Sequence, residues 1–82
     1  MAEIYRVMEA IIPDDYKGHL IEVARLGMAF SITHTCNGKL IYTSTYEKEL
    51  DALRISATMG NNLVEEGLEV VLNIKTHLVC PL

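Results

Sequence analysis

Residues 29–45 read AFSITHTCNGKLIYTST, and this stretch decides the fold. Both halves are rich in β-branched and aromatic residues, and the dipeptide Asn37-Gly38 separates them. A type I′ turn needs a positive φ at both central positions, which Asn-Gly accepts readily. The stretch therefore predicts a β-hairpin with a two-residue loop. The cross-strand pairs expected from that loop include Cys36 with Lys39, Thr35 with Leu40, His34 with Ile41 and Thr33 with Tyr42.

The region before the hairpin predicts a strand and then a helix. Residues 3–12 are apolar on both parities and stop at Pro13, which is typical of a strand in the middle of a sheet. A helix is the open alternative for this short apolar run. Asp14 and Asp15 then supply capping carboxylates for a helix that ends at Gly27.

The region after the hairpin predicts a longer helix and a last strand. Residues 44–47, Ser-Thr-Tyr-Glu, fit a capping box, and the helix that follows ends at Gly67. Residues 68–77 alternate apolar with polar side chains, as a half-buried strand does. The whole chain, residues 1–82, is expected to form one α+β domain with a ferredoxin-like βαββαβ order. Right-handed crossovers would give an antiparallel sheet in the spatial order 4-1-3-2, with both helices on one face.

The other face of that sheet is expected to be open and apolar. Monomeric proteins rarely leave a large apolar patch exposed, so we expect a homo-oligomer, a dimer or higher, that associates sheet to sheet or edge to edge. The residues expected at this interface are Tyr5, Val7, Thr33, Thr35, Leu40, Tyr42 and Val71.

Composition excludes several classes of function. The net charge is −4 and the seven Lys and Arg are scattered, so no basic patch is available for nucleic acid. No run of 18 apolar residues exists, so no membrane span is expected. Two cysteines are too few for a disulfide scaffold, which favours a cytoplasmic location.

Three residues are candidates for catalysis: His19, Glu22 and His34. His19 and Glu22 would lie side by side on the expected first helix, as half of an acid–base or metal site, with a solvated surface pair as the alternative. His34 and Cys36 share one face of a strand, and Cys36 would act as a nucleophile only beside a cation or helix start. A similar pair, His77 and Cys80, falls on the opposite edge of the expected sheet, so no metal site is expected.

One segment matches a family pattern. Residues 15–23, DYKGHLIEV, resemble the Asp-x-x-Gly-x-Leu-x-x-Val pattern of ACT domains. The resemblance implies a ferredoxin-like dimer that binds an amino acid or similar small ligand near Asp15 and Gly18, at a subunit interface. A similar outline of hairpin, helix and strand occurs in roadblock-type dimerisation modules, where residues 1–27 would be largely helical.

The sequence therefore predicts a non-enzymatic, homo-oligomeric regulatory or protein-interaction module, with a small-molecule ligand at a subunit interface and no cofactor. One alternative is a small oligomeric enzyme with an acid–base site in a cleft between subunits. Another is a subunit of a larger assembly.

Overall fold

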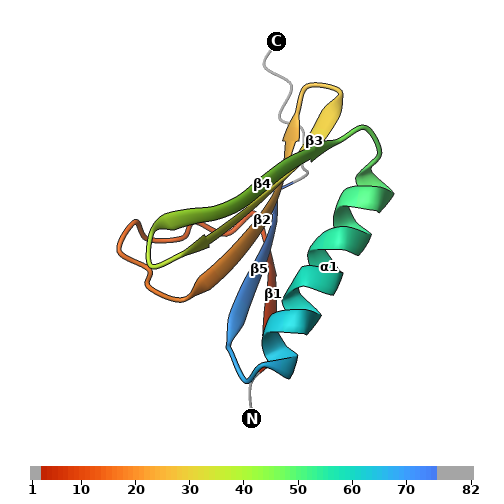
Figure 1. Ribbon diagram of the computed structural model, residues 1–82. Helices are drawn as coiled ribbons and strands as arrows, with labels where there is room; N and C mark the ends of the chain where they lie inside the picture. The colour runs from red at the N-terminus through yellow and green to blue at the C-terminus, as the bar shows by residue number, and fades with distance from the viewer. Residues whose placement is uncertain (1–2, 76–82) are drawn as a thin grey trace.

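The computed structural model describes residues 3–75, which form one mixed sheet and one helix (Figure 1). The elements in chain order are β1 (Ile4–Met8), β2 (His19–Leu26), β3 (Ala29–Cys36), β4 (Lys39–Tyr46), α1 (Glu49–Glu65) and β5 (Val70–Lys75). The expected ferredoxin-like βαββαβ order with two helices is wrong, because a strand occupies most of the region expected to form the first helix.

The five strands lie in the order β1-β5-β2-β3-β4. β5 is inserted between β1 and β2 and runs parallel to both, whereas β2, β3 and β4 form an antiparallel meander. The expected order 4-1-3-2 is therefore wrong. The first strand was expected in the middle of the sheet, but β1 lies at one edge and β4 at the other.

The prediction of a helix over residues 14–27 is wrong, and the burial of the side chains of β2 gives the reason. Ile21 and Val23 are fully buried beneath α1, and Leu20 is buried on the opposite face of the sheet. A strand that is apolar on both faces can mimic helical spacing over a short run. Gly27, expected as a helix C-cap, has a φ of 62° and belongs to the tight turn between β2 and β3.

The predicted hairpin between β3 and β4 is confirmed. Asn37 and Gly38 have φ values of 54° and 77°, as a type I′ turn requires. The first two predicted pairs form, but a β-bulge between His34 and Thr35 then shifts the register by one residue. His34 consequently pairs with Tyr42, whereas Thr33 was expected to do so.

Helix α1 begins later than expected and ends as expected. β4 continues to Tyr46, and the N-cap is Lys48, whose side chain makes no capping hydrogen bond. The predicted capping box is therefore wrong. At the other end Gly67 has a φ of 85°, and its N–H donates to the Val64 carbonyl at 2.9 Å. The Leu68 N–H donates to the Leu63 carbonyl at 3.0 Å, which completes a Schellman motif.

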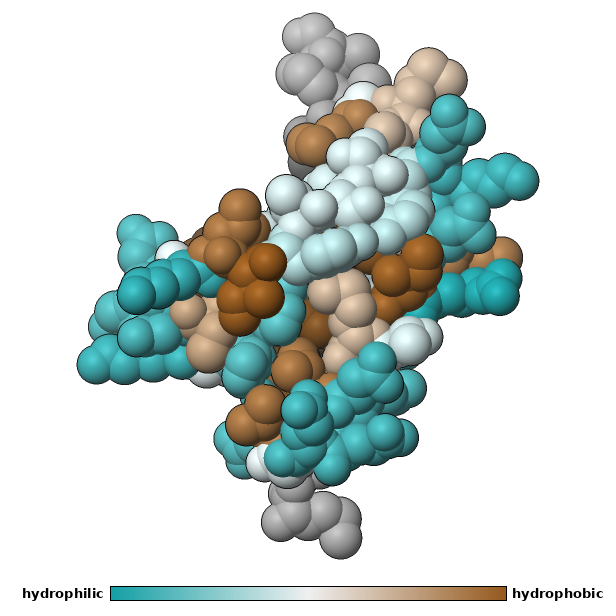
Figure 2. Space-filling model, in the orientation of Figure 1, coloured by the Kyte–Doolittle hydropathy of each residue, from teal (hydrophilic) through white to brown (hydrophobic). Residues whose placement is uncertain are grey.

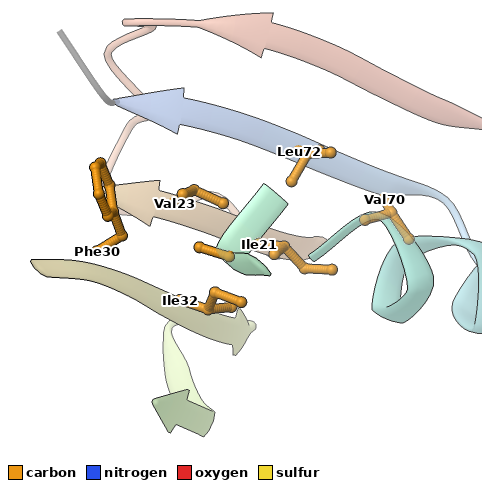
Figure 3. Packing of buried hydrophobic residues seen from close by; sticks show 7 residues of the cluster. Ile21, Val23, Phe30, Ile32, Val70 and Leu72 are labelled. Atoms are coloured by element: carbon orange, nitrogen blue, oxygen red, sulfur yellow. The ribbon is translucent and has the colours of Figure 1, made fainter. Parts of the chain in front are cut away.

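The core lies between α1 and one face of the sheet, which we call the helix face (Figure 3). The buried residues of α1 are small and recur every fourth position: Ala52, Ser56 and Gly60. This stripe lets the helix approach closely, since a Cβ at Gly60 would lie 3.2 Å from Cδ1 of Ile4. The sheet contributes Ile21, Val23, Phe30, Ile32, Val70 and Leu72.

The opposite face of the sheet is not simply open. Residues 9–18, which connect β1 to β2, cross part of it and contact side chains of β2 and β5. We call it the loop face. The hairpin end of β3 and β4 projects past α1 and leaves the helix face uncovered there (Figure 1). Within residues 3–75 no helix has the length and apolar character needed to cross a membrane.

Candidate functional site

Two histidines and a cysteine form a chain of contacts on the helix face near the hairpin end. His19 Nε2 lies 3.7 Å from Cys36 Sγ, and His19 Nδ1 lies 3.1 Å from His34 Nε2. The two imidazole rings are tilted by 39°, with their centroids 5.3 Å apart. His19 therefore stands between the thiol and the second imidazole, with one ring nitrogen facing each.

Sheet register produces this cluster. His19 is the first residue of β2 and pairs directly with Cys36, the last residue of β3. His34 pairs with Ile21, which is the next residue of β2 on the same face as His19. His34 therefore lies on that face too, beside His19. The two-residue turn at Asn37-Gly38 ends β3 at Cys36, which leaves the thiol half-buried at the end of the sheet.

Burial lowers the pKa of His34, and the neighbouring His19 lowers it further. Desolvation disfavours the imidazolium, and a second imidazole at hydrogen-bonding distance adds repulsion when it is charged. The neutral form of His34 is consequently favoured in the folded protein. A neutral imidazole can accept a hydrogen bond at Nε2 while its Nδ1 carries the proton.

The lowered pKa of His34 predicts a loss of stability in mild acid. The unfolded chain takes up a proton near the ordinary value of about 6.5, whereas the folded chain resists it. Stability is therefore full above about pH 6.5 and falls as the pH drops below that value. Urea unfolding at about pH 7.5 and about pH 5.5 should show a larger loss for the wild type than for His34→Gln. Equal losses in both proteins would contradict this assignment.

A second polar network lies on the loop face. Lys75 Nζ forms an ion pair with Glu22 Oε2 at 2.8 Å, and Asn73 Nδ2 donates to the same oxygen at 3.4 Å. The Asn73 amide also binds the backbone of Ala10, donating to its carbonyl at 2.9 Å and accepting from its N–H at 3.2 Å. Asn73 thus holds residues 9–18 against the sheet.

A hollow of about 310 Å³ lies beside this network. Pockets for small ligands begin at about this size. Tyr16 lies at its wall, and burial raises the pKa of the Tyr16 hydroxyl, helped by the negative charges of Glu69 and Cys36. The lining residues of the hollow are Ile12, Pro13, Asp14, Tyr16, Leu20, Glu22, Thr35, Gly38 and Lys75.

The structure regroups the three residues proposed for catalysis. His19 and Glu22 were expected side by side on a helix, but they lie three apart on a strand and point to opposite faces. The structure instead brings His19 together with His34 and Cys36. His77 and Cys80 lie outside the described residues.

The two residues expected to contact a ligand lie beside the hollow but do not line it. Asp15 is exposed in the turn after Pro13, and its neighbour Asp14 reaches the hollow instead. Gly18 leaves room for the Tyr16 ring, because a Cβ at Gly18 would collide with the Tyr16 hydroxyl. Ligand binding by Asp15 and Gly18 stays a prediction.

Most of the residues proposed for an oligomer interface do share one sheet face. The exception is Tyr42, which the bulge turns to the helix face, where its hydroxyl lies 3.2 Å from that of Tyr46. Its expected place on the open face is wrong. The cross-strand register places the others on the loop face: Tyr5, Val7, Thr33, Thr35, Leu40 and Val71.

Two features of the site were not predicted from the sequence. Asn73 and Lys75 were recognised only as polar positions of a half-buried strand, although a fully buried Asn at such a position signals a specific partner. Tyr16 falls in the segment that was expected to form the first helix. Its position two residues before Gly18 was the available signal that an aromatic ring needs space there.

The cluster does not form a metal centre in the described part of the chain. Residues 3–75 contain no group of three His, Cys, Asp or Glu side chains arranged to hold a metal ion. The geometry explains this, because His19 presents opposite nitrogens to its two neighbours and the three donors do not converge.

Comparison with known proteins gives no relative. No protein-family model matches the chain, and neither the curated proteins nor the solved structures contain a significant match.

Proposed function

We propose that this chain is a protein-interaction module that forms a homodimer by pairing the edge strand β4 with β4 of a second copy. The observation that carries this proposal is the exposed apolar surface on β4: Leu40, Ile41 and Tyr42 are 61%, 55% and 40% exposed. β4 ends the sheet order, so its outer edge has no partner strand within residues 3–75.

β4 lacks the usual protection of an edge strand over most of its length. Natural edge strands carry charges, proline or a bulge that prevent further pairing. Between Leu40 and Tyr46 the strand has no charged residue and no proline. The bulge lies at Ile41, near one end, and leaves a regular run of five residues, 42–46. Figure 2 shows brown atoms at the hairpin end of β4 and pale atoms along the rest of it.

A second copy of the chain fits this edge by charge. An antiparallel pairing centred on Thr43 pairs Tyr42 of each copy with Ser44 of the other, and it brings Lys39 of each copy to the same end of the pair as Glu47 of the other. Such two-fold pairing is self-complementary, since each contact occurs twice. Opposite charges across a strand pair stabilise it, whereas like charges destabilise it. The result would be one continuous sheet of ten strands.

The β4 edge suits this role better than the loop face that the sequence suggested. Residues 9–18 already cover part of the loop face, and Leu20 there is buried. The ion pair of Glu22 and Lys75 adds charge to the same surface. The edge of β4 carries neither obstacle.

The substitution Thr43→Lys tests the proposal. Two copies of the new lysine would face each other at the centre of the dimer, so we expect a monomer. Sedimentation equilibrium at micromolar concentration should give twice the chain mass for the wild type and the chain mass for the variant. Thr58→Lys makes the same change on the exposed surface of α1 and should remain dimeric.

Circular dichroism shows whether both variants remain folded. A wild-type monomer at these concentrations contradicts the proposal. So does a dimer that Thr43→Lys leaves intact.

A further inference from the structure

We propose that Cys36 is the nucleophile of an acyl-transfer site, with His19 as its general base and His34 as the residue that positions His19. The order of contacts on the helix face supports this assignment. The thiol touches one nitrogen of His19, and the other nitrogen of His19 touches His34. A nucleophile, a base within reach of it and a third group that orients the base are the recurring parts of such sites.

The role of each of the three residues follows from which of their side chains can carry a charge. Transfer of the thiol proton to His19 Nε2 gives a thiolate beside an imidazolium. That imidazolium donates one hydrogen bond to the thiolate and one to His34 Nε2, and both hydrogen bonds stabilise it. His34 serves as acceptor because its buried ring remains neutral, in line with its lowered pKa. A charged His34 would repel the imidazolium instead.

The surroundings of Cys36 allow a substrate to reach it. Cys36 is half-buried, at the end of β3 that projects past α1. The other titratable groups near the thiol are Tyr16, whose hydroxyl responds to the Cys36 charge, and Lys39, its cross-strand partner. Burial raises the pKa of the Tyr16 hydroxyl, so Tyr16 gives up its proton only at high pH.

The chemical class of substrate is an activated acyl compound, an ester or thioester. The thiolate attacks the acyl carbon, and the bond from that carbon to the leaving oxygen or sulfur breaks. The leaving group takes the proton held on His19 Nε2, and Cys36 becomes a thioester. Water then attacks the thioester with His19 as base, which releases the carboxylic acid and restores the thiol.

This inference differs from the proposed dimer in both place and measurement. The thiol lies on the helix face near the turn, and its chemistry does not need a second copy of the chain. Acylation should therefore continue in Thr43→Lys, so failure of one proposal leaves the other standing.

The probe for the test is p-nitrophenyl acetate at about pH 7, with glutathione as the reference thiol. A Cys80→Ser background leaves Cys36 as the one thiol in the chain. We expect Cys36 to be acetylated at least about tenfold faster than glutathione, and peptide mass mapping should find one acetyl group on residue 36. His19→Gln should slow acetylation at least about tenfold, because general-base assistance contributes factors of about 10²–10⁴.

Variants of His34 separate a positioning role from a purely structural one. His34→Gln keeps an oxygen that can accept from His19 and should retain much of the rate. His34→Leu removes the acceptor and should shift the pH profile of acetylation towards that of a free thiol. Circular dichroism on each variant excludes unfolding as the cause.

Three results would overturn the assignment. The first is acetylation of the wild type at the glutathione rate, and the second is an unchanged rate in a folded His19→Gln. The third is acetylation that appears only after treatment with EDTA, which would make Cys36 a metal ligand.

Discussion

Replacing Ile32 by Ala should destabilise the protein by about 2–5 kcal/mol, the largest effect we expect from one substitution. Ile32 is fully buried in the middle of β3, where it pairs with Val23 and faces α1 (Figure 3). Removing three carbons there loses the burial of apolar surface and leaves a cavity that the rigid sheet closes only in part. A domain of this size has a total stability of about 4–12 kcal/mol, so the variant should be close to unfolding.

The measurement is urea unfolding followed by circular dichroism, with Ile11→Ala as the matched control. Ile11 is 96% exposed, so the same loss of atoms there should change stability by no more than about 0.5 kcal/mol. Equal unfolding midpoints for the two variants would show that Ile32 does not lie in the core.

Replacing Asn73 by Leu should cost about 2–4 kcal/mol and release residues 9–18 from the sheet. Asn73 is fully buried, and its amide makes both a donating and an accepting hydrogen bond to Ala10. Leucine fills a similar volume but leaves the Ala10 N–H and carbonyl without these partners. A polar backbone group that loses its partner costs about 1–3 kcal/mol.

Limited trypsin digestion measures the release directly, since Lys17 lies in this segment. Cleavage at Lys17 should accelerate more than cleavage at Arg54 in α1, which reports on unfolding of the whole domain. Asn62→Leu, on the exposed surface of α1, serves as the control. Parallel acceleration at Lys17 and Arg54 would mean that Asn73 supports the domain as a whole and does not specifically hold the segment.

Elements whose structure depends on short-range signals could be predicted from the sequence. The turn at Asn37-Gly38 needs two left-handed residues, and few dipeptides supply them. The end of α1 at Gly67 depends on the same freedom. The alternation in the last strand placed Val70 and Leu72 correctly towards the core.

Elements whose structure depends on distant neighbours could not be predicted. The segment His19–Leu26 becomes a strand because β3 and β5 pair with its two edges, while α1 packs on one of its faces and residues 9–18 lie against part of the other. Its apolar residues satisfy a helical period equally well, and only tertiary contacts decide between the two. The error also displaced the candidate site, since His19 reaches Cys36 only when β2 is extended.

The bulge at Ile41 also could not be predicted from the sequence. One extra residue in β4 reverses the face of the sheet to which each later side chain points. No residue in the stretch Lys39–Tyr46 predicts this bulge. Tyr42 was consequently assigned to the wrong face, whereas Leu40, which precedes the bulge, was placed correctly.

The insertion of β5 between β1 and β2 constrains the order in which the strands can pair during folding. During translation the β2-β3-β4 meander leaves the ribosome well before β5, so the inner edge of β2 stays without a partner. The nascent β1 also has to wait, because its neighbour is encoded more than 60 residues later. Pairings that span such sequence separation form slowly. The five-stranded sheet therefore cannot be completed before β5 has been synthesised, and until then the unpaired edge of β2 makes the emerging chain prone to aggregation.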